Sequence, residues 1–375
     1  MSKKTIFSIC IAIITWQLTA IAFTLPIKNF SYGSFSQKIE KASISLSHQL
    51  LLTRSASDSE ANYESLVFVG DVLLARNVES IMHRKGNEYP FSGLSLQTLL
   101  KNPAIVGNFE SSMATSHHTT PALMMRFSVN EIFLPALKTA GFTHLSLANN
   151  HSNDYGAEGY EHAKETLFKN GFSVFGHGAF TNSESISYVS TAKGNVALVG
   201  IHASEKEPDE ELLKQILSEA ERHSYLQIVY IHWGSEYSLV HNKVQEKIAG
   251  TLVASGADLI IGHHPHVVQD VDVIDGVVVF YSLGNYIFDQ YFSRDVQEGL
   301  IVALDLSSDP QLNIVPVSSE GHLSQPALMK PDKHQFFLEK LAGRSDSNLR
   351  ADIIKGIVPL YQMVATSTEM AIMMP

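Results

Sequence analysis

Five short apolar segments of this chain each end in side chains that can bind metal ions or move protons. The endings read Gly70-Asp71, Gly107-Asn108-Phe109-Glu110, Asn149-Asn150-His151-Ser152-Asn153-Asp154, His232-Trp233-Gly234-Ser235-Glu236 and Gly262-His263-His264-Pro265-His266. Short apolar runs are typical of buried strands, and open α/β sheets bind ligands at the carboxyl ends of their strands. We therefore expect six of these side chains to meet in one crevice: Asp71, Glu110, Asn150, His232, His264 and His266.

Taken alone, most of these endings also have a purely structural interpretation. A Gly-Asp pair after a strand is commonly a turn with an Asx hydrogen bond, and His151 after two asparagines suits a helix cap. A lone histidine such as His232 is commonly a hydrogen-bonded structural residue, and Glu236 reads as a surface acid or a hydrogen-bond partner near the site. The histidines around Pro265 are harder to explain without a ligand, because three imidazoles lie within four residues there.

The joint occurrence of these groups favours a metal centre. So many polar groups buried in one crevice without partners would cost several kcal/mol unless cations neutralised them. Imidazole combined with carboxylate and an amide oxygen suits Mn, Zn or Fe better than Ca or Mg. We expect two divalent ions about 3.5 to 4 Å apart that share a bridging carboxylate, hold a hydroxide for attack and neutralise an anionic substrate.

Composition and missing motifs exclude several other functions. The formal net charge of −11 provides no basic field to attract nucleic acid or anionic lipid. The single cysteine, Cys10, lies in an apolar run near the amino end, so cysteine catalysis and a Cys-rich zinc site are not expected. The chain has no Gly-x-Ser-x-Gly elbow, Walker loop or dinucleotide fingerprint.

The pattern of apolar segments indicates an α/β fold. Strands are expected at 66–69, 104–106, 144–148, 196–201, 227–231 and 259–261, with helices at 132–139, 157–169, 210–222 and 245–254. This alternation predicts mainly parallel pairing in the first part of the domain. Three later runs, 277–283, 300–306 and 312–317, have no helices between them, so we expect antiparallel strands there. The stretch from about 320 onward is weakly patterned.

The amino end has the features of an export signal. Lys3 and Lys4 precede an apolar run from 6 to 23, and the small residues Ala20 and Ala22 suit signal peptidase. We expect cleavage after Ala22, with an uncleaved membrane anchor as the alternative, and in both cases an exported protein of the periplasm or cell envelope. The predicted organisation is a signal peptide or signal anchor over 1–22, a linker or loose leading segment over 23–64, the main domain over 65–310, and a carboxyl-terminal extension over 311–375 that completes or flanks it.

Six sequence blocks resemble the CapA/PgsA family of bacterial capsule and poly-gamma-glutamate synthesis proteins, which is similar to the calcineurin-like metallophosphoesterases. The matching blocks are 69–74, 107–110, 149–156, 232–236, 262–269 and 282–290, in the order of the family. The resemblance implies a four-layer α/β/β/α sandwich of metallophosphoesterase type, with mixed sheets and the metals at the sheet edges.

The resemblance also implies a role for each matching residue. Asp71 and His266 would bind the first metal, and Glu110 would bridge the two. Asn150, His232 and His264 would bind the second metal, while His151 would protonate the leaving group with its ring oriented by Asp154. One position departs from the wider phosphoesterase pattern Asp-x-His: residue 73 is leucine, which removes one ligand from the first metal.

These observations predict an exported metal-dependent hydrolase of CapA type that acts in capsule or poly-gamma-glutamate biosynthesis or processing. A metal-bound hydroxide would attack either a phosphoester or a gamma-glutamyl amide. The expected partners are an anionic polymer or phosphoester substrate and a capsule or polymer synthase complex in the membrane, with no nucleic acid. The alternative is a non-catalytic accessory protein that binds and guides an anionic capsule polymer during export. Arg126 is then either a surface arginine or a contact for that polymer.

Overall fold

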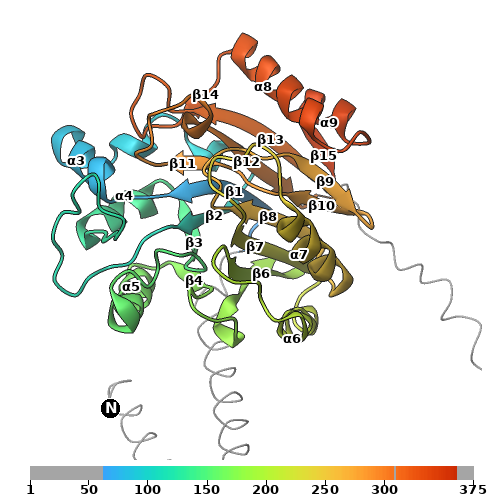
Figure 1. The fold of residues 1–375 in the computed structure, drawn as a ribbon, viewed down its shortest axis with the longest axis horizontal. Helices are drawn as coiled ribbons and strands as arrows, with labels where there is room; N and C mark the ends of the chain where they lie inside the picture. Colours follow the sequence, from blue (N-terminus) through green and yellow to red (C-terminus); the bar gives the residue numbers. More distant parts are fainter. Residues whose placement is uncertain (1–61, 308–309, 361–375) are drawn as a thin grey trace, which may run out of the picture. The chain divides into compact units, whose positions relative to one another are not determined.

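Two β-sheets stacked face to face form the centre of the fold (Figure 1). The computed structural model describes residues 62–307 and 310–360. The larger sheet has nine strands, with the order β14-β13-β12-β1-β2-β3-β4, and β11 and β15 pair with β1 and β13. Its strands are β1 (Ser65–Val72), β2 (Pro103–Phe109), β3 (Phe142–Ser146), β4 (Ser173–Phe175), β11 (Asn285–Ile287), β12 (Glu298–Asp305), β13 (Gln311–Ser318), β14 (Ala327–Leu328) and β15 (Ile357–Pro359).

The smaller sheet has six strands in the order β5-β6-β7-β8-β10-β9. They are β5 (Ile186–Thr191), β6 (Gly194–Ala203), β7 (Leu226–Trp233), β8 (Leu259–His263), β9 (Val271–Ile274) and β10 (Val277–Phe280). The strands β6, β7 and β8 run parallel, with α6 (Glu210–Glu221) and α7 (Lys243–Ala254) in the crossovers between them. Their carboxyl ends therefore lie at one edge of the sheet, where His232 is the second-last residue of β7 and His263 is the last residue of β8.

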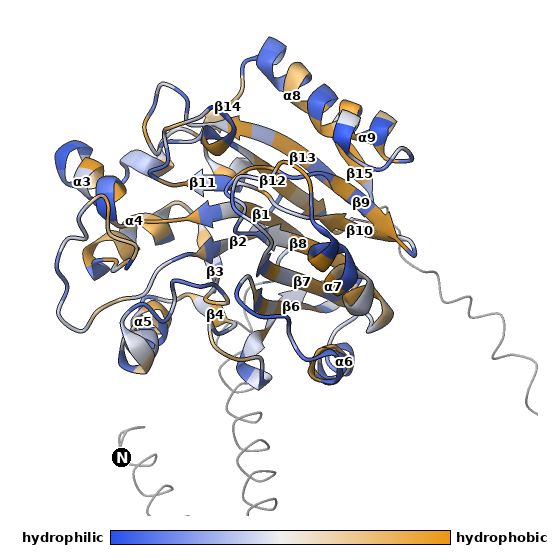
Figure 2. Ribbon diagram, viewed as in Figure 1, coloured by the Kyte–Doolittle hydropathy of each residue, from blue (hydrophilic) through white to orange (hydrophobic). Residues whose placement is uncertain are grey.

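Three apolar clusters fill the spaces between four layers. Alternate residues of β1 show the arrangement, because Leu66 and Phe68 face the space between the sheets while Val67 and Val69 face the helices. The outer face of the larger sheet carries α3 (Arg76–Lys85), α4 (Leu134–Thr139) and α5 (Gly156–Lys169), and α6 and α7 cover the smaller sheet. Figure 2 shows the corresponding apolar strands at the centre. The predicted four-layer α/β/β/α architecture is confirmed.

The chain after residue 277 differs from the expectation in two ways. First, β10 does not join β12 and β13 in one antiparallel run, because it lies in the smaller sheet, where it pairs with β8 in parallel and with β9 in the antiparallel direction. The reason is the short strand β9, which precedes β10 in a hairpin whose turn residues Asp275 and Gly276 both have positive φ, the geometry of a type I′ turn. The antiparallel expectation does hold for β12 and β13, which pair with each other, and β12 also pairs with β1 in that way.

Second, the weakly patterned end of the chain contains two helices. These are α8 (Pro331–Arg344) and α9 (Arg350–Lys355), and β15 follows them in the larger sheet. Phe337, Leu341 and Ile353 are buried in the same apolar cluster as the residues between the sheets. The polar residues that alternate with them in α8 obscure this apolar stripe in the sequence (Figure 2).

The predicted export signal, 1–22, and the leading segment through residue 61 lie outside the described residues. Within the described part of the chain, no helix is long and apolar enough to cross a bilayer. The prediction of export therefore rests on the sequence of the amino end.

Gly70 lets two backbone segments approach each other beside Asp71. The backbone N–H of Asp71 donates to the carbonyl oxygen of Gly284 at 3.0 Å, and β11 begins at the next residue, Asn285. A Cβ atom on Gly70 would lie only 1.9 Å from that same oxygen. The pairing that holds Asp71 in place therefore requires glycine at position 70.

We expect Gly70→Ala to lower the free energy of unfolding by about 3 kcal/mol or more, because the added methyl group meets backbone that cannot rotate away. Gly250→Ala is the matched control. Gly250 lies in α7, and a Cβ atom added there would meet nothing within 4 Å beyond its chain neighbours and the backbone of its own helix. The substitution should therefore change stability by no more than about 1 kcal/mol, in the stabilising direction. Urea denaturation of both variants measures the difference. Equal stabilities would contradict the close-approach argument.

Candidate metal centre

The structure brings all six predicted metal ligands together at one edge of the two sheets. Asp71 and Glu110 come from β1 and the end of β2, Asn150 follows β3, and His232, His264 and His266 come from the end of β7 and the loop after β8. The Nδ1 atom of His266 lies 3.2 Å from Asp71, and its Nε2 atom lies 3.6 Å from Glu110. The Oδ1 atom of Asn150 lies 2.9 Å from Nε2 of His232. Side chains from both sheets thus meet at this edge.

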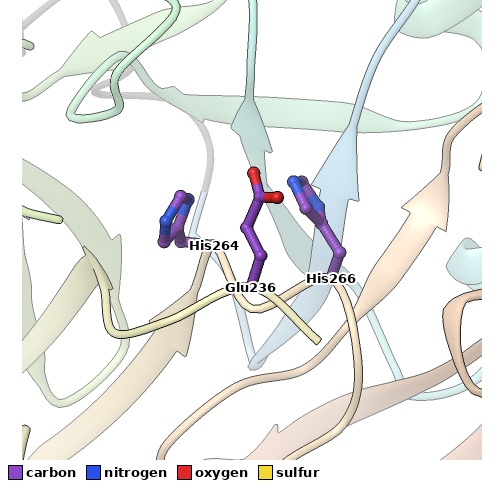
Figure 3. A group of neighbouring side chains, drawn as sticks. All are labelled: Glu236, His264 and His266. Carbon is purple, nitrogen blue, oxygen red and sulfur yellow. The ribbon is translucent and has the colours of Figure 1, made fainter. Parts of the chain in front are cut away.

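Two groups of candidate ligand atoms form within this centre. In each group, one ligand atom per residue lies within 4.8 Å of the others. One group is Asp71, Glu110 and His232, which are all buried, and the other is Glu236, His264 and His266. Figure 3 shows the carboxylate of Glu236 between the two imidazole rings. Glu236 is exposed, as a surface acid would be, but its position makes it a candidate ligand that the sequence argument missed.

Buried atoms without partners show that the centre is suited to cations. Oε1 of Glu110, Nε2 of His263 and Nδ1 of His264 are all buried and have no hydrogen-bond partner. Leaving such atoms unpaired costs about 1 to 3 kcal/mol each. Carboxylate oxygens and imidazole nitrogens that lie within 4.8 Å of one another match the ligand preferences of divalent transition metals.

The pKa shifts of the buried residues also indicate a site that is suited to cations. Burial, together with the nearby charge of Asp71, raises the pKa of Glu110 well above its usual range. Burial lowers the pKa of His266, but Glu110 and Asp71 outweigh it and raise that pKa to about 9. Burial and the neighbouring His266 lower the pKa of His264 to about 3, so this ring is neutral and has a lone pair to offer a metal. The two buried carboxylates thus attract a positive charge.

The loop that carries the histidines has an unusual backbone conformation. His264 has φ 95° and His266 has φ 57°, in a region that residues with a Cβ atom rarely occupy. Such strain costs of order 1 to 3 kcal/mol per residue and typically occurs at functional sites. Pro265 restricts the backbone between them, and its carbonyl oxygen accepts a hydrogen bond from the N–H of Tyr237 at 2.8 Å. The Glu236 loop is thereby attached to the histidine loop.

Several amides and one histidine that were not predicted hold the ligands in place. Asn108 donates from Nδ2 to Asp71 at 2.8 Å, and Asn149 donates to Oδ1 of Asn108 at 3.1 Å. The Nδ1 atom of His263 lies 3.2 Å from Asp71, and Nδ1 of His266 lies 3.0 Å from Oδ1 of Asn285. All four residues lie inside the sequence blocks that match the family. Their place in these blocks, next to the predicted ligands, was the feature of the sequence that could have identified them as part of the site.

His151 and Asp154 form the predicted pair at the side of the centre. Nδ1 of His151 lies 2.9 Å from Oδ2 of Asp154, which also accepts the backbone N–H of Phe127 at 2.6 Å. The imidazole stacks on the Phe127 ring with 3.8 Å between ring centroids. The carboxylate and the aromatic ring together hold the imidazole in one orientation.

Leu73 contributes nothing to the metal centre. Its side chain is fully buried in the apolar cluster between the larger sheet and its helices, and its N–H donates to the carbonyl of Ile287 at 2.8 Å. The ligand that a histidine would supply in the Asp-x-His pattern is therefore absent from this strand. Glu236 is the carboxylate that the structure places beside His264 and His266 instead.

The loop that carries Glu236 is also fixed at its far end, by His241. Both the backbone N–H and Nδ1 of His241 contact the carboxylate of Asp270, at 2.9 and 2.8 Å. Burial lowers the pKa of His241, but the hydrogen bond and charge of Asp270, with smaller contributions from Asp272 and Glu246, raise it above its usual value. Protonated His241 therefore stabilises the folded state.

This pair predicts a pH-dependent stability. The pKa of His241 is higher in the folded chain than in the unfolded chain. The contribution of His241 to the free energy of unfolding is therefore complete below about pH 6.5, the usual histidine pKa, and it disappears as the pH rises through the folded-state pKa. We expect His241→Gln to lower the free energy of unfolding more at pH 5.5 than at pH 9. Urea titrations at both pH values measure this, and a loss that grows with pH would contradict the assignment.

Comparisons with known proteins identify the family of this chain. Residues 65–290 match the model of the bacterial capsule synthesis protein PGA_cap family. The chain is 30% identical to the PGA biosynthesis protein CapA of Bacillus subtilis (strain 168), over 76% of this chain and 78% of that protein. It is 32% identical to the capsule biosynthesis protein CapA of Bacillus anthracis, over 73% of this chain and 72% of that protein.

Solved structures that align with this chain are more distant in sequence. A hypothetical protein from Thermus thermophilus aligns with a TM-score of 0.40 and 13% identity, over 70% of this chain and 96% of that chain. The purple acid phosphatase PPD1 of yellow lupin aligns with a TM-score of 0.33 and 10% identity, over 59% of this chain and 52% of that chain. From the match to its model and from the two CapA relatives, this chain belongs to the bacterial capsule synthesis protein PGA_cap family.

Proposed function

We propose that this protein is an exported, metal-dependent hydrolase that acts in the biosynthesis or processing of a capsule polymer such as poly-gamma-glutamate. The bond it cleaves is a gamma-glutamyl amide or a phosphoester. The observation that carries this proposal is the buried cluster of Asp71, Glu110, His232, His264 and His266, with its unpaired ligand atoms. Membership in a capsule synthesis family supports the biological setting.

The chain provides the parts that such a reaction needs. Asp71, Glu110 and His232 would hold one divalent ion, and Glu236, His264 and His266 would hold the other, with Asn150 adjacent to His232. This grouping exchanges His232 and His266 relative to the assignment that the family resemblance implies. When bound, the ions activate a water molecule and neutralise negative charge on the substrate. The Asp154 carboxylate lies 2.9 Å from Nδ1 of His151 and orients the ring, so that Nε2 would be the atom that donates a proton to the leaving group. Phe127 shields one face of the imidazole from water.

The metal content and turnover of the purified full-length chain test this proposal. We expect elemental analysis to find bound Mn, Zn or Fe. We also expect the protein to hydrolyse a model phosphodiester or a gamma-glutamyl anilide, and this activity should stop after chelation and return when Mn²⁺ or Zn²⁺ is added. Bound metal without turnover on either substrate would contradict the hydrolase proposal. An accessory protein that binds the polymer and uses the metals only to hold it would then replace it.

Fractionation of the native cells tests the proposed location. The charged start and apolar run over 6–23 predict recovery in the periplasm or the cell envelope. A mature chain that begins at Phe23 would support cleavage after Ala22, whereas an intact amino end in the membrane fraction would support the anchor. Full-length protein in the cytosol would contradict export.

A further inference from the structure

A buried arginine lies beside the metal centre and has no role in the function proposed above. Arg76 begins α3 and is only 7% exposed. Its guanidinium carbon lies 4.4 Å from the ring centroid of Phe127 and 5.7 Å from that of Phe288. These two rings pack in turn on His151 and His266, at centroid distances of 3.8 and 4.6 Å. One aromatic ring thus lies between Arg76 and the candidate proton donor His151, and another lies between Arg76 and the candidate ligand His266.

The surrounding structure holds this arginine in place at a cost in free energy. Arg76 has φ 52°, a left-handed conformation that residues with a Cβ atom rarely adopt. Its Nη2 atom forms an ion pair with Oδ1 of Asp289, whose side chain is 2% exposed. The other oxygen of Asp289 accepts the backbone N–H of Asn77 at 3.2 Å. Backbone strain and a desolvated ion pair are each unfavourable, and such features typically occur where a site needs a fixed charge.

The guanidinium has unused capacity to donate hydrogen bonds. Nη2 of Arg76 donates to Asp289. Nη1 donates only to the sulfur of Met125, a weak acceptor, at 3.7 Å. The Nε atom is buried and has no partner. Met125 is 59% exposed, in a segment where Leu123 and Met124 are also exposed. A side chain covered by so weak an acceptor on an exposed segment can exchange that contact for an anion.

The charge of Arg76 also reaches the metal centre. Its electrostatic effect contributes to the pKa of Glu110 in the centre and to that of Tyr237 at its edge. Arg126, the arginine singled out in the sequence, is exposed, and it donates from Nε to the backbone oxygen of Asp154 at 3.0 Å. Of these two arginines, Arg76 is therefore the one whose guanidinium is buried beside the metal centre.

We propose that Arg76 is an anion subsite that binds a carboxylate of the polymer beside the bond held at the metal centre. This inference rests on the proposed function, because it assumes that an anionic polymer enters the centre. Asp289 fixes the planar guanidinium through Nη2, and the donors left on Nη1 and Nε suit the oxygens of a carboxylate. The subsite would select repeats that carry a free carboxylate over their neutral carboxamide analogues.

Binding of a short gamma-linked glutamate oligomer and of its alpha-carboxamide form, measured by calorimetry on the full-length chain, tests the subsite. Arg76→Met should weaken binding of the acid roughly 10- to 100-fold, the range for a charged hydrogen bond, and leave carboxamide binding unchanged. Arg76→Lys keeps the charge and the backbone strain but not the planar fork, so it should retain part of the preference. Arg84→Met, an exposed position in the same helix, is the matched control and should bind both oligomers as the wild type does.

Metal content and thermal unfolding show whether each variant is intact. If Arg76→Met does not fold because Asp289 is left buried and unpaired, the double variant Arg76→Met with Asp289→Asn removes both charges and allows the same measurement. Intact protein that binds the acid as tightly as wild type would overturn the subsite, as would a wild type that binds neither oligomer.

A turnover assay separates this proposal from the hydrolase proposal. With gamma-glutamyl p-nitroanilide and its alpha-carboxamide, Arg76→Met should lower kcat/KM for the acid roughly 10- to 100-fold and leave the carboxamide unaffected. If the wild type has no turnover while its binding preference still depends on Arg76, the hydrolase proposal fails and the subsite stands. If the wild type turns over both substrates and Arg76→Met keeps the preference for the acid, the subsite fails and the hydrolase stands.

Discussion

His266→Ala should weaken transition-metal binding by more than about 100-fold, because loss of partners outside the first ligand shell alone typically costs 10- to 100-fold. Nδ1 of His266 lies 3.2 Å from Asp71 and Nε2 lies 3.6 Å from Glu110, so the ring sits between the two buried carboxylates of the centre. The substitution leaves both carboxylates without this partner. Elemental analysis of purified protein and a competitive chelator titration measure the change.

Two comparisons make this prediction specific. His334→Ala removes a partly exposed histidine of α8 and should leave the metal content unchanged. Glu236→Gln removes one carboxylate charge beside His264 and His266, and should weaken the binding of one ion more than that of the other. An unchanged stoichiometry in His266→Ala would remove this residue from the ligand set, and His263, whose Nδ1 atom also contacts Asp71, would be the imidazole to test in its place.

The sequence was sufficient to predict most of the architecture, because buried strands and amphipathic helices have distinct periods. The run over 227–231 and the helical pattern over 245–254 correspond to β7 and α7. Short elements were harder to find. β9 has four residues, and only its Asp275-Gly276 turn marked the hairpin that makes β10 parallel to β8. A two-residue turn controls strand direction without altering the apolar pattern around it.

The predicted site residues converge because they follow parallel strands, whose carboxyl ends share one edge of each sheet. Sequence reasoning could not place Arg76, since its significance depends on Asp289, which is 213 residues away along the chain. Glu236 was also missed as a candidate ligand, because exposure and sequence position alone do not distinguish a surface acid from a ligand. Its position depends on the hydrogen bond between Tyr237 and Pro265, a contact between two loops.

The second large effect concerns proton donation by His151. If the protein is a hydrolase, His151→Asn should lower turnover by roughly 10² to 10⁴, the usual size of a general-acid contribution, while metal content and stability stay close to wild type. The ring is 7% exposed, stacks on Phe127 and is oriented by Asp154 at 2.9 Å, and it belongs to neither group of candidate ligand atoms. Turnover of phosphodiester and gamma-glutamyl substrates with Mn²⁺ or Zn²⁺ measures the loss.

Leaving-group dependence distinguishes proton donation from a structural role. A substrate whose leaving group is already a weak base needs little protonation in the transition state, so the effect of His151→Asn should shrink for a nitrophenyl ester and grow for an alkyl ester. A structural defect would slow both substrates by the same factor. Polymer binding gives a third measurement, because removing this one imidazole should change affinity by about 1 kcal/mol or less, the scale of a single hydrogen bond. A wild type without metal-dependent turnover, together with a variant that binds polymer equally well, would leave His151 without a catalytic role and favour the accessory function.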